Sequence, residues 1–324
     1  MTETTDHQGF VPPVWLRSPV VQSALASAKF RKRGASDIEQ AAQYHLLTGG
    51  SGARTSCLLS RHPQSRGLVV ILHGWLGSVQ SAYVVSTAKF LFRQGFSVCR
   101  VNLLEHGDAV TLNPGFHHAA EDADLFDAIA QVTDLTDDKE VSLIGYSLGG
   151  NFALRVARRL RSQPIPKMRH VFAVSPVIDP VTSSPMIDAH PLMRAYFTRK
   201  LRRWLREKTK AFPDRYQAGN IAQQKSVLGM SDDIICGWTE FETLDDYFRA
   251  YRLIPEDFDG CPARLTLFGA FDDPVVNGAD IAAMAGRDMD VVMSPLGGHN
   301  GFFDTVRGPT FYDRAILNSL STRV

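Results

Sequence analysis

Short apolar runs alternate with stretches of helical periodicity along most of the chain. The runs that predict strands lie at 42–48, 53–61, 67–74, 96–102, 141–144, 169–174, 263–268 and 290–293. Helices are predicted at 83–93, 115–132 and 151–160, and at the end of the chain, at 302–320. This alternation is typical of an α/β fold, in which helices cover both faces of a mostly parallel sheet. The first two strands are separated only by a Gly-rich turn at 49–52, which predicts a hairpin.

The alternation stops between residues 176 and 260. This segment contains no apolar strand and is aromatic, basic and mostly helical in its pattern. An insertion between two core strands, on the side where the strands end, is where a cap over an active site would lie. We therefore predict four parts, namely an N-terminal arm at 1–40, a first core part at 41–175, a helical cap at 176–260 and a second core part at 261–324.

The N-terminal arm combines a proline-containing entry with a stretch of helical propensity at 20–29 and a basic cluster at 31–33. Such a segment could form an amphipathic membrane anchor. Because its apolar stretch is short and interrupted by serine and glutamine, we expect the arm to pack across the main domain instead.

The segment 141–160 carries the main chemical signal of the sequence. A short apolar strand is followed at once by Gly145-Tyr146-Ser147-Leu148-Gly149 and then by a helical pattern. A G-x-S-x-G turn between a strand and a helix is a nucleophile elbow. The serine occupies a strained backbone conformation at the tip of the turn, and the glycines allow strand and helix to approach closely. Ser147 is therefore the predicted nucleophile.

A serine nucleophile needs a general base and a carboxylate that orients this base. In this class of fold the acid and the histidine follow the serine in chain order. His299 follows the last predicted strand and is flanked by glycines, and Asp272 and Asp273 both follow the strand at 263–268. We choose Asp272, because Asp273 precedes a proline and could instead shape the turn.

Two backbone amides are predicted to hold the negative charge that forms on the substrate oxygen. The residue after the nucleophile, Leu148, supplies one amide N–H. The second is expected from Trp75, in the loop after the strand at 67–74, where Gly74 keeps the backbone close to the elbow. The Trp75 side chain could form a wall of the acyl pocket, and His73 is expected to order the loop through hydrogen bonds.

These residues together resemble the α/β-hydrolase superfamily, and the finer pattern is similar to its YheT-like branch, which is related to the embryogenesis-associated hydrolases. The resemblance covers nearly the whole chain and is weakest in the cap. It is carried by the segments 12–19, 73–83, 145–151, 272–274 and 297–302. The resemblance implies an α/β-hydrolase fold with an inserted helical cap, and a serine hydrolase that cleaves carboxylic esters, often of lipid or acyl type, without a metal or cofactor.

Two segments depart from the pattern of this branch. After the strand at 96–102 the branch usually carries a longer, arginine-containing motif, whereas this chain has a segment with His106 and Asp108, which could line the rim of the site. The cap also contains a strongly basic stretch at 198–210. This stretch could associate weakly with anionic membrane surfaces, but a solvated helix that packs its leucines and tryptophan inward is the favoured interpretation.

The composition is that of an ordinary soluble globular protein, with 44% hydrophobic and 21% charged residues. The 35 Lys and Arg residues nearly balance the 34 Asp and Glu residues, which argues against a nucleic-acid partner. The four cysteines lack metal-binding spacing, and the N-terminus lacks the apolar region of a secretory signal. We therefore expect a cytoplasmic protein, and the resemblance implies that it acts on a small-molecule ester without a metal or cofactor.

Two other functions remain compatible with the sequence. The same three residues could transfer an acyl group to an alcohol or cleave a thioester, depending on whether the cap excludes water. A fold of this type could also serve as a ligand-binding protein without catalysis, but such a protein has no need of Ser, Asp and His together.

Overall fold

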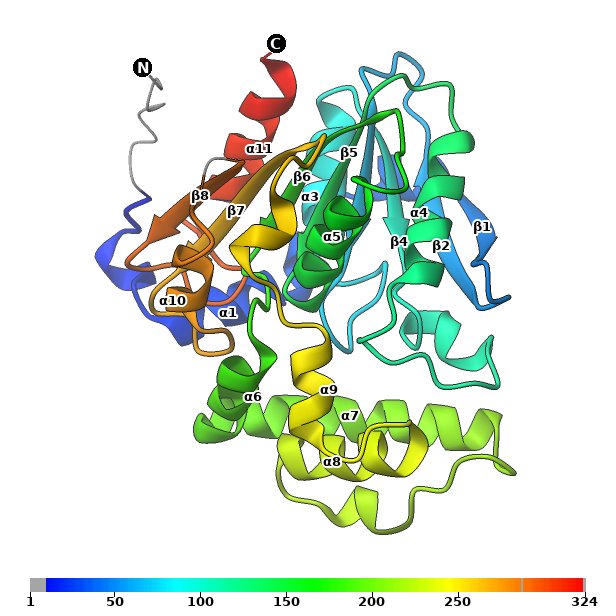
Figure 1. Cartoon of the computed structure of the whole chain (residues 1–324). Helices are drawn as coiled ribbons and strands as arrows, with labels where there is room; N and C mark the ends of the chain where they lie inside the picture. Colours follow the sequence, from blue (N-terminus) through cyan, green and yellow to red (C-terminus); the bar gives the residue numbers. More distant parts are fainter. Residues whose placement is uncertain (1–9, 287, 323–324) are drawn as a thin grey trace.

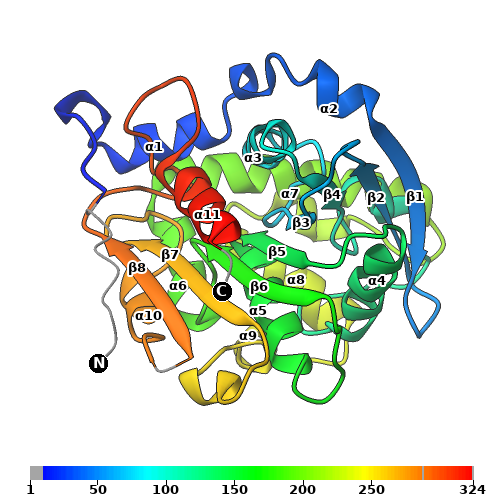
Figure 2. The same ribbon diagram turned by 90° about the horizontal axis from the view of Figure 1, so that it is seen from above.

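A computed structural model describes residues 10–286 and 288–322 of the chain. Its centre is an eight-stranded sheet with the order β1-β2-β4-β3-β5-β6-β7-β8 (Figures 1 and 2). Strands β1 and β2 form the expected hairpin, β2 pairs antiparallel with β4, and all other pairs are parallel. The strands are β1 (Ala42–Thr48), β2 (Arg54–Ser60), β3 (Leu68–Leu72), β4 (Ser97–Val101), β5 (Val141–Tyr146), β6 (Met168–Val174), β7 (Arg264–Ala270) and β8 (Met289–Ser294).

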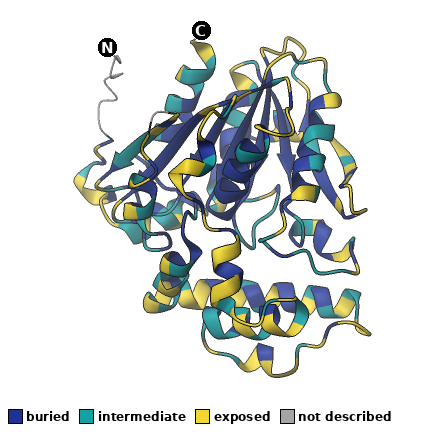
Figure 3. Cartoon of the chain, viewed as in Figure 1, coloured by how far each residue is buried: buried dark blue, intermediate teal, exposed yellow. Residues whose placement is uncertain are grey.

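Helices cover both faces of this sheet, which confirms the predicted fold class. The outer helices are α1 (Pro19–Ala26), α2 (Ser36–Gln40), α3 (Ala82–Arg93), α4 (Ala123–Asp134), α5 (Leu148–Arg159), α10 (Gly278–Ala282) and α11 (Phe311–Ser321). Residues of β3 alternate between the two faces, as the twofold period of a strand requires. Val70 belongs to the core shared with α4 and α5, and Val69 and Ile71 belong to the core shared with α3 and α11. All residues of β3 are buried, as expected for a central parallel strand, and Figure 3 shows the strands of the sheet mostly in the dark blue of buried residues.

Four helices lie between β6 and β7 in the chain and form a layer beside the sheet edge (Figure 1). They are α6 (Pro180–Ala189), α7 (Pro191–Ala211), α8 (Val227–Trp238) and α9 (Leu244–Ala250). Short 3-10 turns occur at η1 (Val14–Leu16), η2 (Lys29–Lys32), η3 (Gly107–Thr111), η4 (Gly219–Gln223) and η5 (Pro255–Phe258). We call α6 to α9 the cap helices.

Two helices begin later than the sequence pattern predicts. The predicted helix at 115–132 starts only at Ala123, because the amide of Ala119 donates to the Tyr247 hydroxyl at 3.1 Å instead of continuing a helix. The predicted helix at 302–320 starts only at Phe311. Thr310 caps it and exchanges hydrogen bonds with Asp313, a capping box that fixes this helix start.

Helix α1 lies against the loop that follows β8. Gln22 is fully buried in α1, and its side-chain amide donates to the carbonyl of Phe303 at 2.9 Å. The amide N–H of Phe303 donates back to the Gln22 side chain at 2.8 Å. This reciprocal pair fixes α1 to the second part of the core.

The basic stretch at 198–210 lies in α7. Leu201, Trp204 and Leu205 are buried and pack with α8 and η4, whereas Arg199, Arg203 and Arg206 are exposed. This is the amphipathic arrangement of a helix on a protein surface. Association of the exposed arginines with anionic membranes stays a prediction. No helix in the described ranges is long and apolar enough to span a membrane.

Candidate active site

Ser147 lies in a tight turn between β5 and α5. Its backbone angles, φ 55° and ψ −119°, are sterically unfavourable for a residue with a side chain. The turn needs its two glycines. A Cβ atom on Gly145 would collide with the carbonyl of Gly149, and a Cβ atom on Gly149 would collide with the carbonyl of His73. The local structure therefore has the geometry of a nucleophile elbow.

The imidazole of His299 pairs with Asp273. Its Nδ1 atom lies 2.8 Å from Oδ2 of Asp273, whose side chain is fully buried. The other oxygen of Asp273 accepts hydrogen bonds from the amides of Val275 and Val276, at 2.8 and 3.1 Å. These bonds orient the carboxylate, and the carboxylate in turn orients the histidine ring.

The expectation that Asp272 orients His299 is therefore wrong. Asp272 accepts a hydrogen bond from the amide of Gly298 at 2.8 Å, and its burial raises the pKa of its carboxyl group. The preference for Asp272 rested on the proline that follows Asp273. In the structure Asp273 both shapes the turn, through the amides of Val275 and Val276, and faces the histidine.

Hydrogen bonds at the sheet edge bring the serine loop and the histidine loop together. The amide of Ser147 donates to Val174 at the end of β6, and the amide of Val177 donates back to the carbonyl of Ser147. The amide of Asn300, next to His299, donates to the Ser175 hydroxyl at 3.1 Å. In the described residues the Ser147 hydroxyl and the His299 ring do not form a hydrogen bond. In unliganded sites such catalytic bonds are often long and tighten when substrate binds.

The predicted oxyanion donors lie beside the elbow. A Cβ atom on Gly74 would come 3.0 Å from Cβ of Ser147, so the loop that carries Trp75 passes very close to the serine. Neither Trp75 nor Leu148 donates its amide hydrogen to another group in the described part of the chain. Free backbone N–H groups close to a nucleophile can hold an oxyanion, and this role of Trp75 and Leu148 stays a prediction.

His73 orders the loop before Trp75. Its Nδ1 atom donates to the carbonyl of Gly74 at 2.8 Å, and its Nε2 atom accepts from the amide of Leu103 at 3.1 Å. Complete burial holds the pKa of the His73 imidazole well below its usual range. The ring is therefore neutral and acts through these hydrogen bonds, as the sequence predicts.

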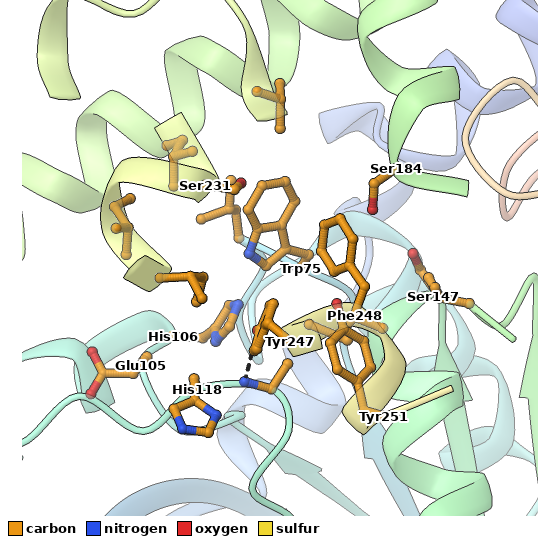
Figure 4. Close-up of a pocket in the computed structure, with 18 of the residues that line it drawn as sticks. Trp75, Glu105, His106, His118, Ser147, Ser184, Ser231, Tyr247, Phe248 and Tyr251 are labelled. Atoms are coloured by element: carbon orange, nitrogen blue, oxygen red, sulfur yellow. Dashed lines mark hydrogen bonds between the residues drawn. The ribbon is translucent and has the colours of Figure 1, made fainter. Parts of the chain in front are cut away.

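A largely apolar cavity lies between the elbow and the cap helices (Figure 4). Its volume is about 140 Å³, close to that of an engineered cavity of ~150 Å³ that holds a benzene molecule. Ser147 and Leu148 lie on its wall, and Trp75 stacks on Phe197 of α7 with ring centroids 5.7 Å apart. The Trp75 side chain thus lines this cavity. The cap contributes several further aromatic and aliphatic walls, namely Leu201, Trp204, Ile234, Ile235, Tyr247, Phe248 and Tyr251.

Comparison with known sequences identifies the family. The sequence profile of the alpha/beta hydrolase family matches residues 69–307, which is more than half of the chain. The chain belongs to the alpha/beta hydrolase family. A search of curated protein sequences finds no significant match. The narrower resemblance to the YheT-like branch stays a prediction.

Solved structures with a similar fold include several hydrolases. The esterase Pf2001 of Pyrococcus furiosus is 16% identical, with a TM-score of 0.55 over 86% of this chain and 89% of the esterase. A membrane phospholipase A, described as a bacterial virulence factor, is 14% identical, with a TM-score of 0.57 over 94% of this chain and 93% of its own. The naproxen esterase of Bacillus subtilis is 12% identical, with a TM-score of 0.53 over 86% and 92%. At these identities the likeness establishes the fold of this alpha/beta hydrolase.

The two polar residues considered for the rim of the site lie in different places. His106 is buried and lines the cavity. Asp108 is not a cavity residue, because its carboxylate accepts hydrogen bonds from Tyr44, Ser56 and Asn102. The prediction that Asp108 lines the rim of the site is therefore wrong. Within the described ranges no group of three or more His, Cys, Asp or Glu side chains could hold a metal ion.

An ion pair that sequence reasoning missed connects the core to the cap of this alpha/beta hydrolase. Lys208 of α7 and Glu105 of the loop after β4 are both buried, and they lie 2.9 Å apart. The Trp204 indole also donates to the backbone carbonyl of Glu105 at 2.8 Å. Burial raises the pKa of Glu105 to about 7 and lowers the pKa of Lys208, although each partner opposes the shift of the other. The basic character of the stretch at 198–210 gives no sign that Lys208 is buried.

Proposed function

We propose that this alpha/beta hydrolase cleaves carboxylic esters with Ser147 as nucleophile, His299 as general base and Asp273 as the orienting acid. The observation that carries the proposal is the 2.8 Å contact between His299 Nδ1 and Asp273, on a loop tied to the Ser147 elbow. Asp273 fixes the proton on Nδ1, which leaves Nε2 as the base.

The reaction runs through an acyl-enzyme. His299 Nε2 takes the hydroxyl proton of Ser147 while Oγ attacks the carbonyl carbon, and the amides of Trp75 and Leu148 donate to the resulting oxyanion. Collapse of this intermediate breaks the bond to the alcohol, which leaves with the proton from His299. A water molecule, deprotonated by His299, then attacks the acyl carbon and releases the acid and free Ser147.

The apolar cavity favours a substrate with a hydrocarbon acyl or lipid-type group next to the ester. Structures of similar fold include proteins named esterase and phospholipase, and the YheT-like resemblance points to the same class of ester. The volume of the cavity favours an acyl group of roughly six carbons over a long unbranched chain. The cap helices, in this proposal, form a lid that limits entry of water.

A cytoplasmic location is part of the same proposal. Cys57 and Cys99 are buried as free thiols, and Cys236 and Cys261 are also unpaired. Unpaired cysteines are typical of proteins in a reducing compartment.

Labelling with a fluorophosphonate tests the nucleophile, and an ester panel of increasing acyl length tests the reaction. We expect a single label on Ser147, none on a Ser147→Ala variant, and loss of turnover by several orders of magnitude in that variant. Hydrolysis that survives Ser147→Ala would exclude the mechanism, and a clean failure of wild-type labelling would favour a ligand-binding protein. Addition of competing alcohols separates hydrolysis from acyl transfer, because a transferase forms the new ester.

A further inference from the structure

Two histidine rings lie on the cavity wall away from Ser147. His106 follows β4 and His118 precedes α4, and both side chains are more than nine-tenths buried. Figure 4 shows Ser147 on one side of the cavity and both histidines on the other, with Tyr247 and Phe248 between them. Each ring has one nitrogen, His106 Nε2 and His118 Nδ1, that is buried and has no hydrogen-bond partner among the described residues.

The hydrogen bonds of His106 determine its tautomer. Its Nδ1 atom lies 2.7 Å from the carbonyl oxygen of Leu104. A carbonyl can only accept, so Nδ1 carries the hydrogen. Burial also lowers the pKa of the ring to about 4, which keeps it neutral. The Nε2 atom is therefore a hydrogen-bond acceptor, and no donor among the described residues bonds to it.

His118 presents a similar unpartnered nitrogen. Its Nε2 atom lies 3.3 Å from a carboxylate oxygen of Glu240 and 3.6 Å from one of Glu121, so Nε2 is the donor. Its other nitrogen, Nδ1, has no partner in the described residues. The ring is held between Phe241 and Tyr247 by edge-on contacts, with centroids 5.3 and 5.8 Å away.

The described residues leave both nitrogens without a hydrogen-bond partner. The Trp204 indole N–H is already bonded to the carbonyl of Glu105, and neither the Trp75 indole nor the Ser231 hydroxyl, which also line the cavity, forms a hydrogen bond with either ring. A buried acceptor without a partner has lost its hydrogen bonds to water and gained none in return, which is unfavourable. In a substrate cavity, such an acceptor favours a ligand that brings its own hydrogen-bond donor.

We propose that the cavity selects esters whose cavity-bound group carries a hydroxyl, which donates to Nε2 of His106. The inference rests on the proposed ester hydrolysis at Ser147 and narrows its substrate class. An unsubstituted acyl chain fills the same apolar space but leaves the histidine acceptor unpaired.

Matched pairs of methyl esters test this selection, each pair differing only in a hydroxyl replaced by a methyl group. Suitable pairs are 6-hydroxyhexanoate with heptanoate, and the 3- and 4-(hydroxymethyl)phenylacetates with the corresponding ethylphenylacetates. We expect kcat/KM to favour the hydroxyl compound by roughly tenfold or more in at least one pair. In His106→Phe, which keeps the ring but removes the acceptor, this ratio should fall to about one.

The control variant is His45→Phe, since His45 also has a buried, unpartnered ring nitrogen but lies in β1, outside the cavity. It should keep the wild-type ratio. A wild-type ratio near one in every pair, or a ratio that survives His106→Phe, would overturn the inference. His106→Gln retains an acceptor and should keep part of the preference if the phenylalanine variant does not fold.

Binding to Ser147→Ala protein separates this inference from the proposed hydrolysis. The same ester pairs are titrated while thermal stabilisation is measured, so no turnover is needed. We expect the hydroxyl compounds to bind more tightly, and we expect this difference to be lost when His106→Phe is added. Such a result supports selection of hydroxyl groups by the cavity even if wild-type protein hydrolyses none of the esters. Equal binding of both members of every pair overturns the inference and leaves the nucleophile to be judged by fluorophosphonate labelling.

Discussion

The Nζ atom of Lys208 lies 2.9 Å from a carboxylate oxygen of Glu105, and neither side chain reaches solvent. Lys208 also donates to the backbone carbonyls of Asn113 and Gly115. This ammonium group therefore connects α7 of the cap to two loops of the core. Its charge is stabilised by one carboxylate and two carbonyls, all of which lose the ammonium group if the lysine is removed.

Replacement of this lysine should destabilise the protein strongly. We expect Lys208→Met to lower the free energy of unfolding by about 3–5 kcal/mol, because it leaves a buried carboxylate unpaired. The matched control is Arg203→Met on the same helix, whose exposed ion pair with Glu207 is worth about 0.3–0.5 kcal/mol. Urea unfolding curves measure both. Equal effects of the two variants would contradict a stabilising role of the buried pair.

The same pair should make stability depend on pH. Burial raises the pKa of Glu105 in the folded protein to about 7, above the ordinary value of 4.5. Between these values the folded state binds a proton that the unfolded state lacks, so the contribution of Glu105 to stability falls as pH rises from about 4.5 to 7. Urea unfolding of wild type and Glu105→Gln at pH 5, 6 and 7.5 measures it. The stability of wild type relative to the variant should decrease across this range, and a constant difference would contradict the shifted pKa.

Substitution of the two neighbouring aspartates should separate their roles. Asp273→Asn should lower kcat for ester hydrolysis by about 10⁴-fold, because His299 then loses the carboxylate that fixes its tautomer. Asp272→Asn keeps an acceptor for the Gly298 amide and should have a far smaller effect. Steady-state kinetics of both variants on one ester decides the assignment, and the reverse order of effects would return the role to Asp272.

Because the elbow is closely packed, we expect that Gly149 cannot be replaced by a residue with a side chain. In Gly149→Ala the added methyl group collides with the backbone carbonyl of His73. A backbone atom can be displaced only at a larger cost in free energy than the end of a flexible side chain. We expect loss of fluorophosphonate labelling and a lower melting temperature. Gly237→Ala is the control, because a Cβ atom there meets nothing within 4 Å, and it should stabilise α8 by about 0.5–1 kcal/mol. Normal labelling of Gly149→Ala would show that the turn tolerates a wider separation.

The elbow could be predicted from the sequence because its requirements are local. A strand, a strained serine and two glycines follow one another within ten residues, and each has its own physical reason. The choice between Asp272 and Asp273 could not be made in this way, because consecutive residues of a turn point in different directions. The contact of Asp273 with His299 depends on how the amides of Val275 and Val276 orient its carboxylate, which only the structure shows.

The cavity could not be predicted from the sequence, for a different reason. The aromatic character of the cap was visible, but the partners of Tyr247 and Trp204 come from loops more than ninety positions earlier in the chain. The same long-range contacts delay the start of α4 and aim His118 at the cavity. Helical periodicity carries no information about such contacts. The sequence pattern therefore predicts a start for α4 that is too early.

The hydrogen bonds between α1 and the loop after β8 have a consequence for biosynthesis. The hydroxyl of Ser23 accepts a hydrogen bond from the amide of His299, 276 positions further along the chain, and Gln22 pairs with Phe303 across 281 positions. Neither bond can form before both of its residues have been synthesised. The loop that carries His299 therefore gains its support from α1 only after the chain has been made through Phe303.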